Sequence, residues 1–135
     1  MSRQIFVNLP VKNLDATVAF FTKLGFTFNP QFTDENATCM IIDENIFAML
    51  LVEPFFKTFT RREIADTSKY VEVLNAISVE SREAVDKMLS DAIAAGGTEP
   101  LPAQDHGWMY SRAFSDIDGH TWEIFYADMS QLPKE

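Results

Sequence analysis

Near its end the chain has the sequence FSDIDGHTWE, residues 114–123. One run with alternating polarity, residues 108–114, leads into this stretch, and a second, residues 120–126, follows it. Between the two runs, DIDG at residues 116–119 has the composition of a tight turn. The stretch therefore predicts a β-hairpin whose two strands are the alternating runs.

The elements expected before this hairpin complete a module. Residues 71–79 form a strand pattern, and Ser81 can then cap a helix that Gly96 and Gly97 end. The apolar positions of that helix share one face, and a short strand is expected near Thr98. The helix face consists of Val85, Met88, Leu89 and Ala92.

The first half of the chain predicts the same order of elements. A strand over residues 5–11 precedes a helix that Asn13 can cap and Gly25 can end. Three further strands are expected over residues 26–28, 37–42 and 46–52, the last two joined by a tight turn. The face of this first helix consists of Leu14, Val18, Phe21 and Leu24.

The sequence thus predicts two copies of a βαβββ module in one α+β domain. Module one covers about residues 4–53 and module two about residues 70–127. The linker, about residues 54–69, carries Phe55, Phe56 and Phe59 beside basic residues. We expect it to form a loop or a short helix that covers a pocket or packs on a second subunit.

Composition excludes several classes of partner. Of the 135 residues, 47% are hydrophobic and 23% are charged, which is typical of a folded globular protein. Lysine and arginine number 11 against 20 aspartates and glutamates, so the formal net charge is -9. This balance argues against binding to nucleic acid, which needs clustered cations, and leaves open a cationic or neutral small ligand.

The single cysteine and the lack of long apolar runs indicate where the protein works. Cys39 cannot form an intrachain disulfide or supply a cysteine-rich zinc site, and its apolar neighbours predict a buried, inert thiol. No run approaches the roughly 20 apolar residues of a membrane span, and no signal-peptide core is seen. We expect a cytoplasmic protein that does not bind membranes.

Three stretches resemble a known superfamily. FVNLPVKNLD at residues 6–15 enters the first helix, FFTKLGF at residues 20–26 closes it, and FSDIDGHTWE matches a D-P-D-G-x-x-x-E signature with Ile117 in place of proline. They resemble the vicinal oxygen chelate superfamily, which includes glyoxalase (lactoylglutathione lyase), extradiol dioxygenases, fosfomycin-resistance thiol transferases and bleomycin-resistance proteins. The resemblance implies that two βαβββ modules form a curved mixed β-sheet around a cavity.

The resemblance also implies where a metal would bind. Metal-using members hold the ion with one side chain from the first and one from the last strand of each module. Here these positions are Phe6, Met49, Leu74 and Glu123. The first three cannot supply the oxygen or imidazole ligands that divalent ions need. We therefore expect no metal and no cofactor; a divalent metal held in another arrangement, with His106 as the outside candidate ligand, is the alternative.

Strand alternation suggests which residues line the cavity. It places Thr121, Glu123 and Phe125 on one face of the last strand, which by the resemblance faces the cavity. A carboxylate there needs a partner, and Arg112 is the candidate, either within a binding site or as a plain brace of the sheet. The expected pocket residues are Phe6, Asn8, Met49, Leu74, Trp108, Tyr110, Arg112 and Glu123, with Glu123 the one catalytic candidate. His120 is expected to be a solvated turn residue on the opposite face.

Three functions fit these observations. The first is a bleomycin-resistance-like protein that binds a small molecule without a metal. The second is a metal-dependent lyase or extradiol dioxygenase with non-standard ligands, and the third is a non-catalytic interaction module. We also expect a homodimer, because burying the linker phenylalanines would favour association; an intrachain lid that buries the same rings is the alternative.

Overall fold

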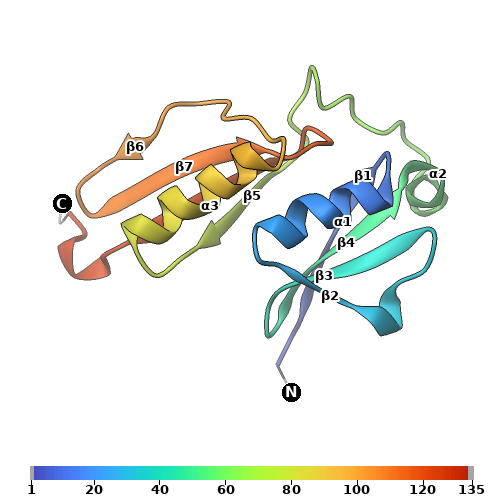
Figure 1. Cartoon of the computed structure of the whole chain (residues 1–135), viewed down its shortest axis with the longest axis horizontal. Coiled ribbons are helices and arrows are strands. Elements are labelled where there is room, and N and C mark those ends of the chain that lie inside the picture. Colours follow the sequence, from blue (N-terminus) through green and yellow to red (C-terminus); the bar gives the residue numbers. More distant parts are fainter. Residues whose placement is uncertain (1, 134–135) are drawn as a thin grey trace. The chain divides into compact units, whose positions relative to one another are not determined.

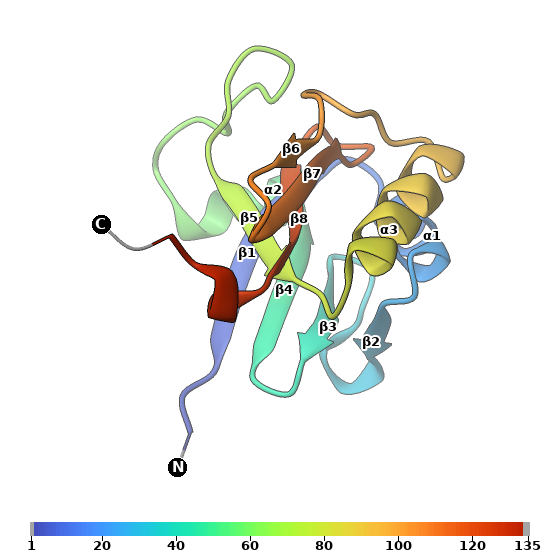
Figure 2. The same ribbon diagram turned by 90° about the vertical axis from the view of Figure 1, so that its left-hand side faces the viewer.

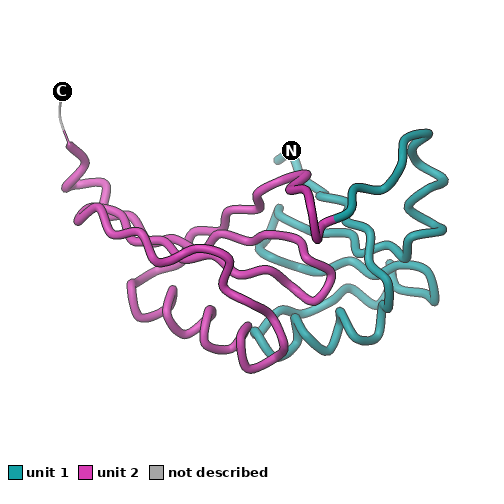
Figure 3. The backbone as a smooth tube through the Cα atoms, turned by 90° about the horizontal axis from the view of Figure 1, so that it is seen from above, with its two compact units in different colours: residues 1–66 teal, residues 67–135 magenta. Residues whose placement is uncertain are grey.

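Each half of the chain folds into a four-stranded mixed sheet with one main helix (Figure 1). The computed structural model describes residues 2–133. It divides into two units, residues 1–66 and 67–135, which Figure 3 colours separately. Each unit has the element order βαβββ, so the predicted α+β fold of two similar modules is confirmed.

Unit 1 has the strand order β1-β4-β3-β2, with β1 parallel to β4 and the other pairs antiparallel. The chain between unit 1's last strand and unit 2's first strand begins with a short α-helix and a 3-10 turn, as expected of the linker. The elements are β1 (Ile5–Val11), α1 (Leu14–Lys23), β2 (Thr27–Asn29), η1 (Pro30–Phe32), β3 (Ala37–Asp43), β4 (Ile46–Val52), α2 (Glu53–Phe56) and η2 (Lys57–Phe59).

Unit 2 repeats this topology with the order β5-β8-β7-β6, and only β5 and β8 are parallel. A single β-bridge joins Thr98 to Ser115, where a short strand was expected. The elements are β5 (Leu74–Ser78), α3 (Arg82–Ala94), β6 (Gln104–Asp105), β7 (Met109–Ser115), β8 (Thr121–Ala127) and η3 (Met129–Gln131).

Both helices begin at the predicted caps. The side chain of Asn13 accepts a hydrogen bond from the Ala16 N–H at 3.0 Å, and Ser81 accepts one from Ala84 at the same distance. These bonds satisfy N–H groups that the first turn of a helix leaves without a partner. The caps therefore fix where each helix starts, independently of the rest of the fold.

Each helix covers one face of its own sheet (Figure 2). On α3 the buried residues are Val85, Leu89 and Ala92, as predicted, while Met88 is half-buried. On α1 the predicted Leu14 and Phe21 are buried, as is Leu24 directly after the helix, while Val18 is half-buried. Thr17 and Phe20 are also buried and widen the predicted face.

Several predicted strands differ at their ends, and β7 and β8 each lie one residue later than expected. β5 begins at Leu74 and not at residue 71. The pairing of β5 with β8 starts at Leu74, opposite Thr121, and residues 71–73 do not take part in it. β2 lies one residue later than expected. Among residues 2–133, no helix is long and apolar enough to cross a membrane.

Candidate functional site

The two faces of the unit 2 sheet differ at its strand β8: α3 covers one face, and the other is open. Trp122 and Ile124 are buried, with exposed fractions of 1% and 0%, on the side where α3 packs. Glu123 alternates with them and is half-buried on the other side. The predicted orientation of β8 agrees with this arrangement: the carboxylate of Glu123 lies on the face that the helix leaves open.

The predicted pairing of Arg112 with Glu123 is wrong. In the β7–β8 ladder Arg112 lies opposite Ile124, and Ala113 lies opposite Glu123. Arg112 is therefore on the helix-covered face, together with Tyr110 and with Phe114, whose ring stacks on Trp122. Trp108 lies just before β7 and is half-buried. Trp108, Tyr110 and Arg112 thus do not join Glu123 in a pocket.

Arg112 instead belongs to a polar cluster between α3 and β7. Its guanidinium donates to both carboxylate oxygens of Glu99 at 3.2 Å and to Asp86 of α3 at 2.9 Å. The Tyr110 hydroxyl also donates to Asp86, at 2.5 Å. The hydrogen bonds from Tyr110 and Arg112 lower the pKa of Asp86, and those to Glu99 and Asp86 raise the pKa of Arg112. The cluster holds α3 against β7.

A double-mutant cycle should measure which carboxylate Arg112 contacts. Because the side chains of Arg112 and Glu99 are 26% and 29% exposed, we expect a coupling of only about 0.5–1 kcal/mol between Arg112→Ala and Glu99→Ala in urea denaturation. The same cycle with Glu123→Ala should give a coupling near zero. A larger coupling to Glu123 than to Glu99 would contradict the contact between Arg112 and Glu99.

His120 is buried rather than solvated. Its side chain is 2% exposed, and Nδ1 lies 2.9 Å from Oε1 of Glu72. Asp116 accepts the His120 backbone N–H at 3.0 Å, the Asp118 N–H at 2.9 Å and the Trp122 indole N–H at 2.9 Å. Burial raises the pKa of Asp116, and His120 and these donors oppose the rise. The start of the DIDG signature therefore forms a turn that the Asp116 side chain stabilises by hydrogen bonds.

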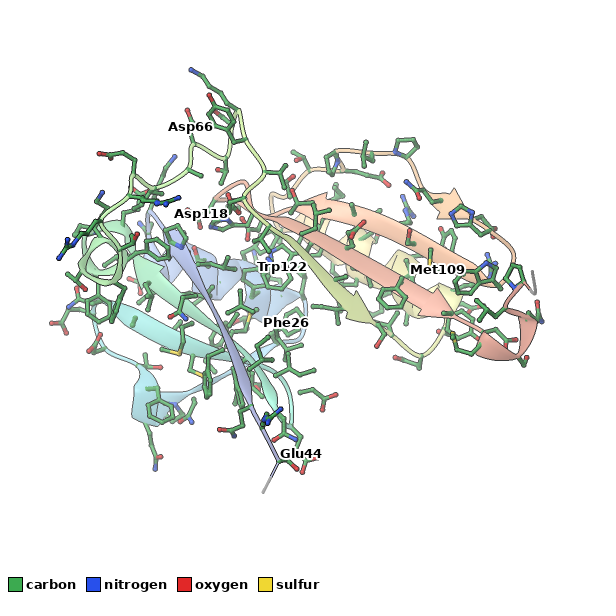
Figure 4. The ribbon with its side chains drawn as sticks, turned by 180° about the vertical axis from the view of Figure 1, so that it is seen from behind. Phe26, Glu44, Asp66, Met109, Asp118 and Trp122 are labelled. Atoms are coloured by element: carbon green, nitrogen blue, oxygen red, sulfur yellow. The ribbon has the colours of Figure 1, made fainter. Side chains whose placement is uncertain are left out.

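The open face of unit 2 contains a pocket of about 210 Å³ beside Glu123. Its lining comes from three strands: Ala76 from β5, Met109 and Ser111 from β7, and Glu123 and Phe125 from β8. In Figure 4 Met109 marks one end of the β7–β8 hairpin and Asp118 the turn at the other end. Met109 and Ser111 were missed in the sequence because the other face of β7 was assigned to the pocket.

The open face of unit 1 presents the predicted positions of the first module. Asn8 is paired with Met49 in the parallel β1–β4 register, and Phe6 is paired with Phe47, its ring stacked at 4.8 Å. Parallel pairing places Phe6, Asn8 and Met49 on one face. The Asn8 amide donates to the Phe6 carbonyl at 3.2 Å, and Phe6 is 42% exposed.

In unit 2 the second pair of family positions also shares a face. Leu74 lies opposite Thr121, and Glu123 lies opposite Ala76, two residues further along each strand. Leu74 and Glu123 therefore lie on one face of the sheet, on neighbouring parallel strands. Leu74 is 55% exposed at the edge of the sheet.

The donor set does not fit the divalent metal site that the fold family implies. Of Phe6, Met49, Leu74 and Glu123, only Glu123 carries a hard oxygen ligand. Within the described part of the chain, no three His, Cys, Asp or Glu side chains come together as a metal-binding group. His106 is exposed in the loop after β6, where its backbone N–H bonds to the Met109 carbonyl at 2.8 Å.

Comparison with solved structures decides the fold. The chain matches a hypothetical protein from S. aureus at 24% identity, with a TM-score of 0.79 over 94% of this chain and 95% of that one. A glyoxalase/bleomycin resistance protein/dioxygenase family enzyme from Burkholderia phytofirmans matches at 18% identity, with a TM-score of 0.79 over 93% and 99%. This chain has the vicinal oxygen chelate fold.

Two further comparisons agree with the resemblance seen in the sequence. A bleomycin resistance determinant encoded on the transposon Tn5 matches at 17% identity, with a TM-score of 0.66 over 94% of this chain and 99% of that one. Residues 3–42 match the family model described as bleomycin resistance protein-like N-terminal. No curated protein matches the chain significantly. These comparisons agree with the fold that the resemblance implied, and the chemistry has to be argued from the residues.

Proposed function

We propose that this chain is a glyoxalase/bleomycin-resistance-like protein that binds a small molecule on the open face of its sheet, without the superfamily's metal. The observation that carries the proposal is the pocket beside Glu123, walled by Met109, Phe125 and Ala76. Apolar walls with a few polar groups are typical of small-molecule sites. The match of residues 3–42 to a bleomycin resistance-like family supports the same assignment.

A pocket-filling variant tests binding. Ala76→Leu adds bulk to the pocket wall on the edge strand β5, and we expect it to weaken binding of any compound found by a thermal-shift screen by at least about tenfold. Ala94→Leu adds the same bulk to the exposed surface of α3 and should leave binding unchanged. A screen without hits, or hits that Ala76→Leu does not weaken, would favour a non-catalytic interaction module.

Metal analysis tests the second part of the proposal. Chelator-treated protein should take up far less than one equivalent of nickel, zinc, manganese or iron, because the family positions supply a single carboxylate. Tight stoichiometric binding that disappears in Glu123→Ala would contradict this and favour a metal-dependent lyase or dioxygenase. A metal held through the exposed His106 would survive that change, so His106→Ala is the paired control.

We also propose that the protein is a homodimer. In the linker, Phe59 is 68% exposed and contacts Phe55 edge-to-face at 5.1 Å. Covering such rings contributes about 1.5–3 kcal/mol each, and a two-fold interface covers one patch with its own copy. Light scattering at micromolar concentration should give twice the chain mass of 15.3 kDa, and Phe59→Asp should reduce it toward one chain. A wild-type mass of one chain would contradict the dimer and favour the intrachain lid.

We further propose a cytoplasmic location. The one cysteine, Cys39, is buried, and burial raises the pKa of its thiol, so it is kept in the unreactive protonated form. Disulfide-stabilised folds are typical of oxidising compartments, and this chain has none of their cysteine pairs. Fractionation of the source cells would test the location.

A further inference from the structure

We propose that the pocket beside Glu123 selects an amine: a single ammonium group attached to a small apolar body. This inference rests on the proposed binding function and names the chemical class of its ligand. The ammonium group would bind the Glu123 carboxylate, and the apolar body would lie against Phe125 and Met109. Three features of unit 2 support it.

The first feature is that Glu123 has no cationic partner among residues 2–133. Within residues 2–133 no donor bonds to its carboxylate. The cations of unit 2 that form ion pairs use other acids: Arg82 pairs with Asp105, Lys87 with Asp91, and Arg112 with Asp86 and Glu99. A cation stabilises a half-buried carboxylate beside apolar walls, and a bound ligand can supply one.

The second feature is that the neighbours of Glu123 are small. Ala76 on β5 and Ala113 on β7 lie directly opposite it, and Ser78 and Ser111 lie opposite Phe125. Directly opposed residues share a face of the sheet, so small side chains on both flanking strands leave open space beside the longer side chains of Glu123 and Phe125. The pocket beside Glu123 is a consequence of these small side chains on β5 and β7.

The third feature is the combination of size, polarity and charge in the pocket beside Glu123. The pocket measures about 210 Å³, below the roughly 300–1,000 Å³ of sites that hold drug-sized ligands, and its lining is dominated by apolar groups around one carboxylate and the Ser111 hydroxyl. An anion would be repelled by Glu123 and by a chain of net charge -9. A neutral ligand would leave the carboxylate without a counter-charge. A small apolar amine fits the size and apolar lining of the pocket and brings a positive charge to the carboxylate.

Titration with matched probes tests the ligand class. We would follow amide and methyl resonances of the full chain by NMR while adding 2-phenylethylamine, 2-phenylethanol or 3-phenylpropanoate. The amine should shift resonances of Met109, Ser111 and Phe125 and bind at least about tenfold more tightly than the alcohol. The carboxylate should not bind. Glu123→Gln should remove the preference for the amine while retaining the shape of the side chain.

A matched acid elsewhere separates a local effect from overall charge. Glu83→Gln removes the same charge from the exposed first turn of α3, on the covered side of the sheet, and should leave amine binding unchanged. If the amine and alcohol bind equally at the pocket and Glu123→Gln has no effect, the ligand class is wrong while the binding function stands. If no probe shifts the pocket resonances at millimolar concentration, or only sites elsewhere respond, this inference is overturned; the compound screen with Ala76→Leu then decides the binding function separately.

Discussion

Replacing Asp116 by alanine should lower the free energy of unfolding by about 3–5 kcal/mol. Asp116 is 6% exposed, and its carboxylate accepts hydrogen bonds from the Asp118 and His120 backbone and from the Trp122 indole. Alanine would leave these three donors without their acceptor, two of them in bonds that are fully buried. Each unsatisfied buried donor is costly because it has already lost its bond to water. Asp116 therefore stabilises the turn that starts β8.

Asp116→Asn is the matched control. Its carbonyl oxygen can still accept the two backbone N–H groups, while its NH₂ group faces the Trp122 indole, so the expected loss is smaller, about 1–2 kcal/mol. Urea denaturation followed by tryptophan fluorescence measures both variants within unit 2, because Trp108 and Trp122 both lie there. Equal losses in the two variants, or a loss below about 1 kcal/mol in Asp116→Ala, would show that these bonds do not hold the turn.

Replacing Gly119 by alanine should cost about 2–4 kcal/mol of unfolding free energy, the second-largest effect expected. Gly119 has a φ of +83°, a left-handed conformation that side chains other than glycine adopt only with strain. A β-carbon there would also come within 2.8 Å of the Thr67 β-carbon and still closer to its hydroxyl oxygen. Thr67 cannot move away freely, since its hydroxyl donates to the Asp118 carbonyl.

Gly107 separates the two contributions. Its φ of +81° is nearly the same, but a β-carbon there would meet nothing within 4 Å. Gly107→Ala should therefore cost only the strain, about 1–2 kcal/mol. The difference between the two variants in the same denaturation measurement is the cost of the contact with Thr67. Equal losses would contradict the close packing of Thr67 on this turn.

The order of the elements was determined by local sequence. Asn13 and Ser81 cap their helices, and Gly25 ends α1 with a φ of +97°. These features depend on residues within one turn of each other, so no distant contact is needed to produce them. The predicted repetition of βαβββ, and with it the fold, therefore followed from the sequence.

The partner of Arg112 is decided by the tertiary structure. Alternation showed correctly which residues of β7 share a face, but not which face α3 covers. The pairing register across the turn at residues 116–119 indicates which face of β7 the helix covers. It places Arg112 opposite Ile124 and Phe114 opposite Trp122, and both partners are buried on the helix side of β8. Combining alternation with this register would have moved Tyr110 and Arg112 out of the pocket.

The sequence by itself determined that Glu123 is the one carboxylate among the four family positions and that it shares a face with Thr121 and Phe125. Only the tertiary structure decided that Glu123 lines a pocket with no cationic partner among residues 2–133 and that His120 is buried against Glu72. The physical reason is the distance along the sequence between the residues that interact. Caps, turns and alternation are fixed by neighbours along the chain, whereas burial and ion pairing depend on strands and helices that fold onto them from far away in the sequence.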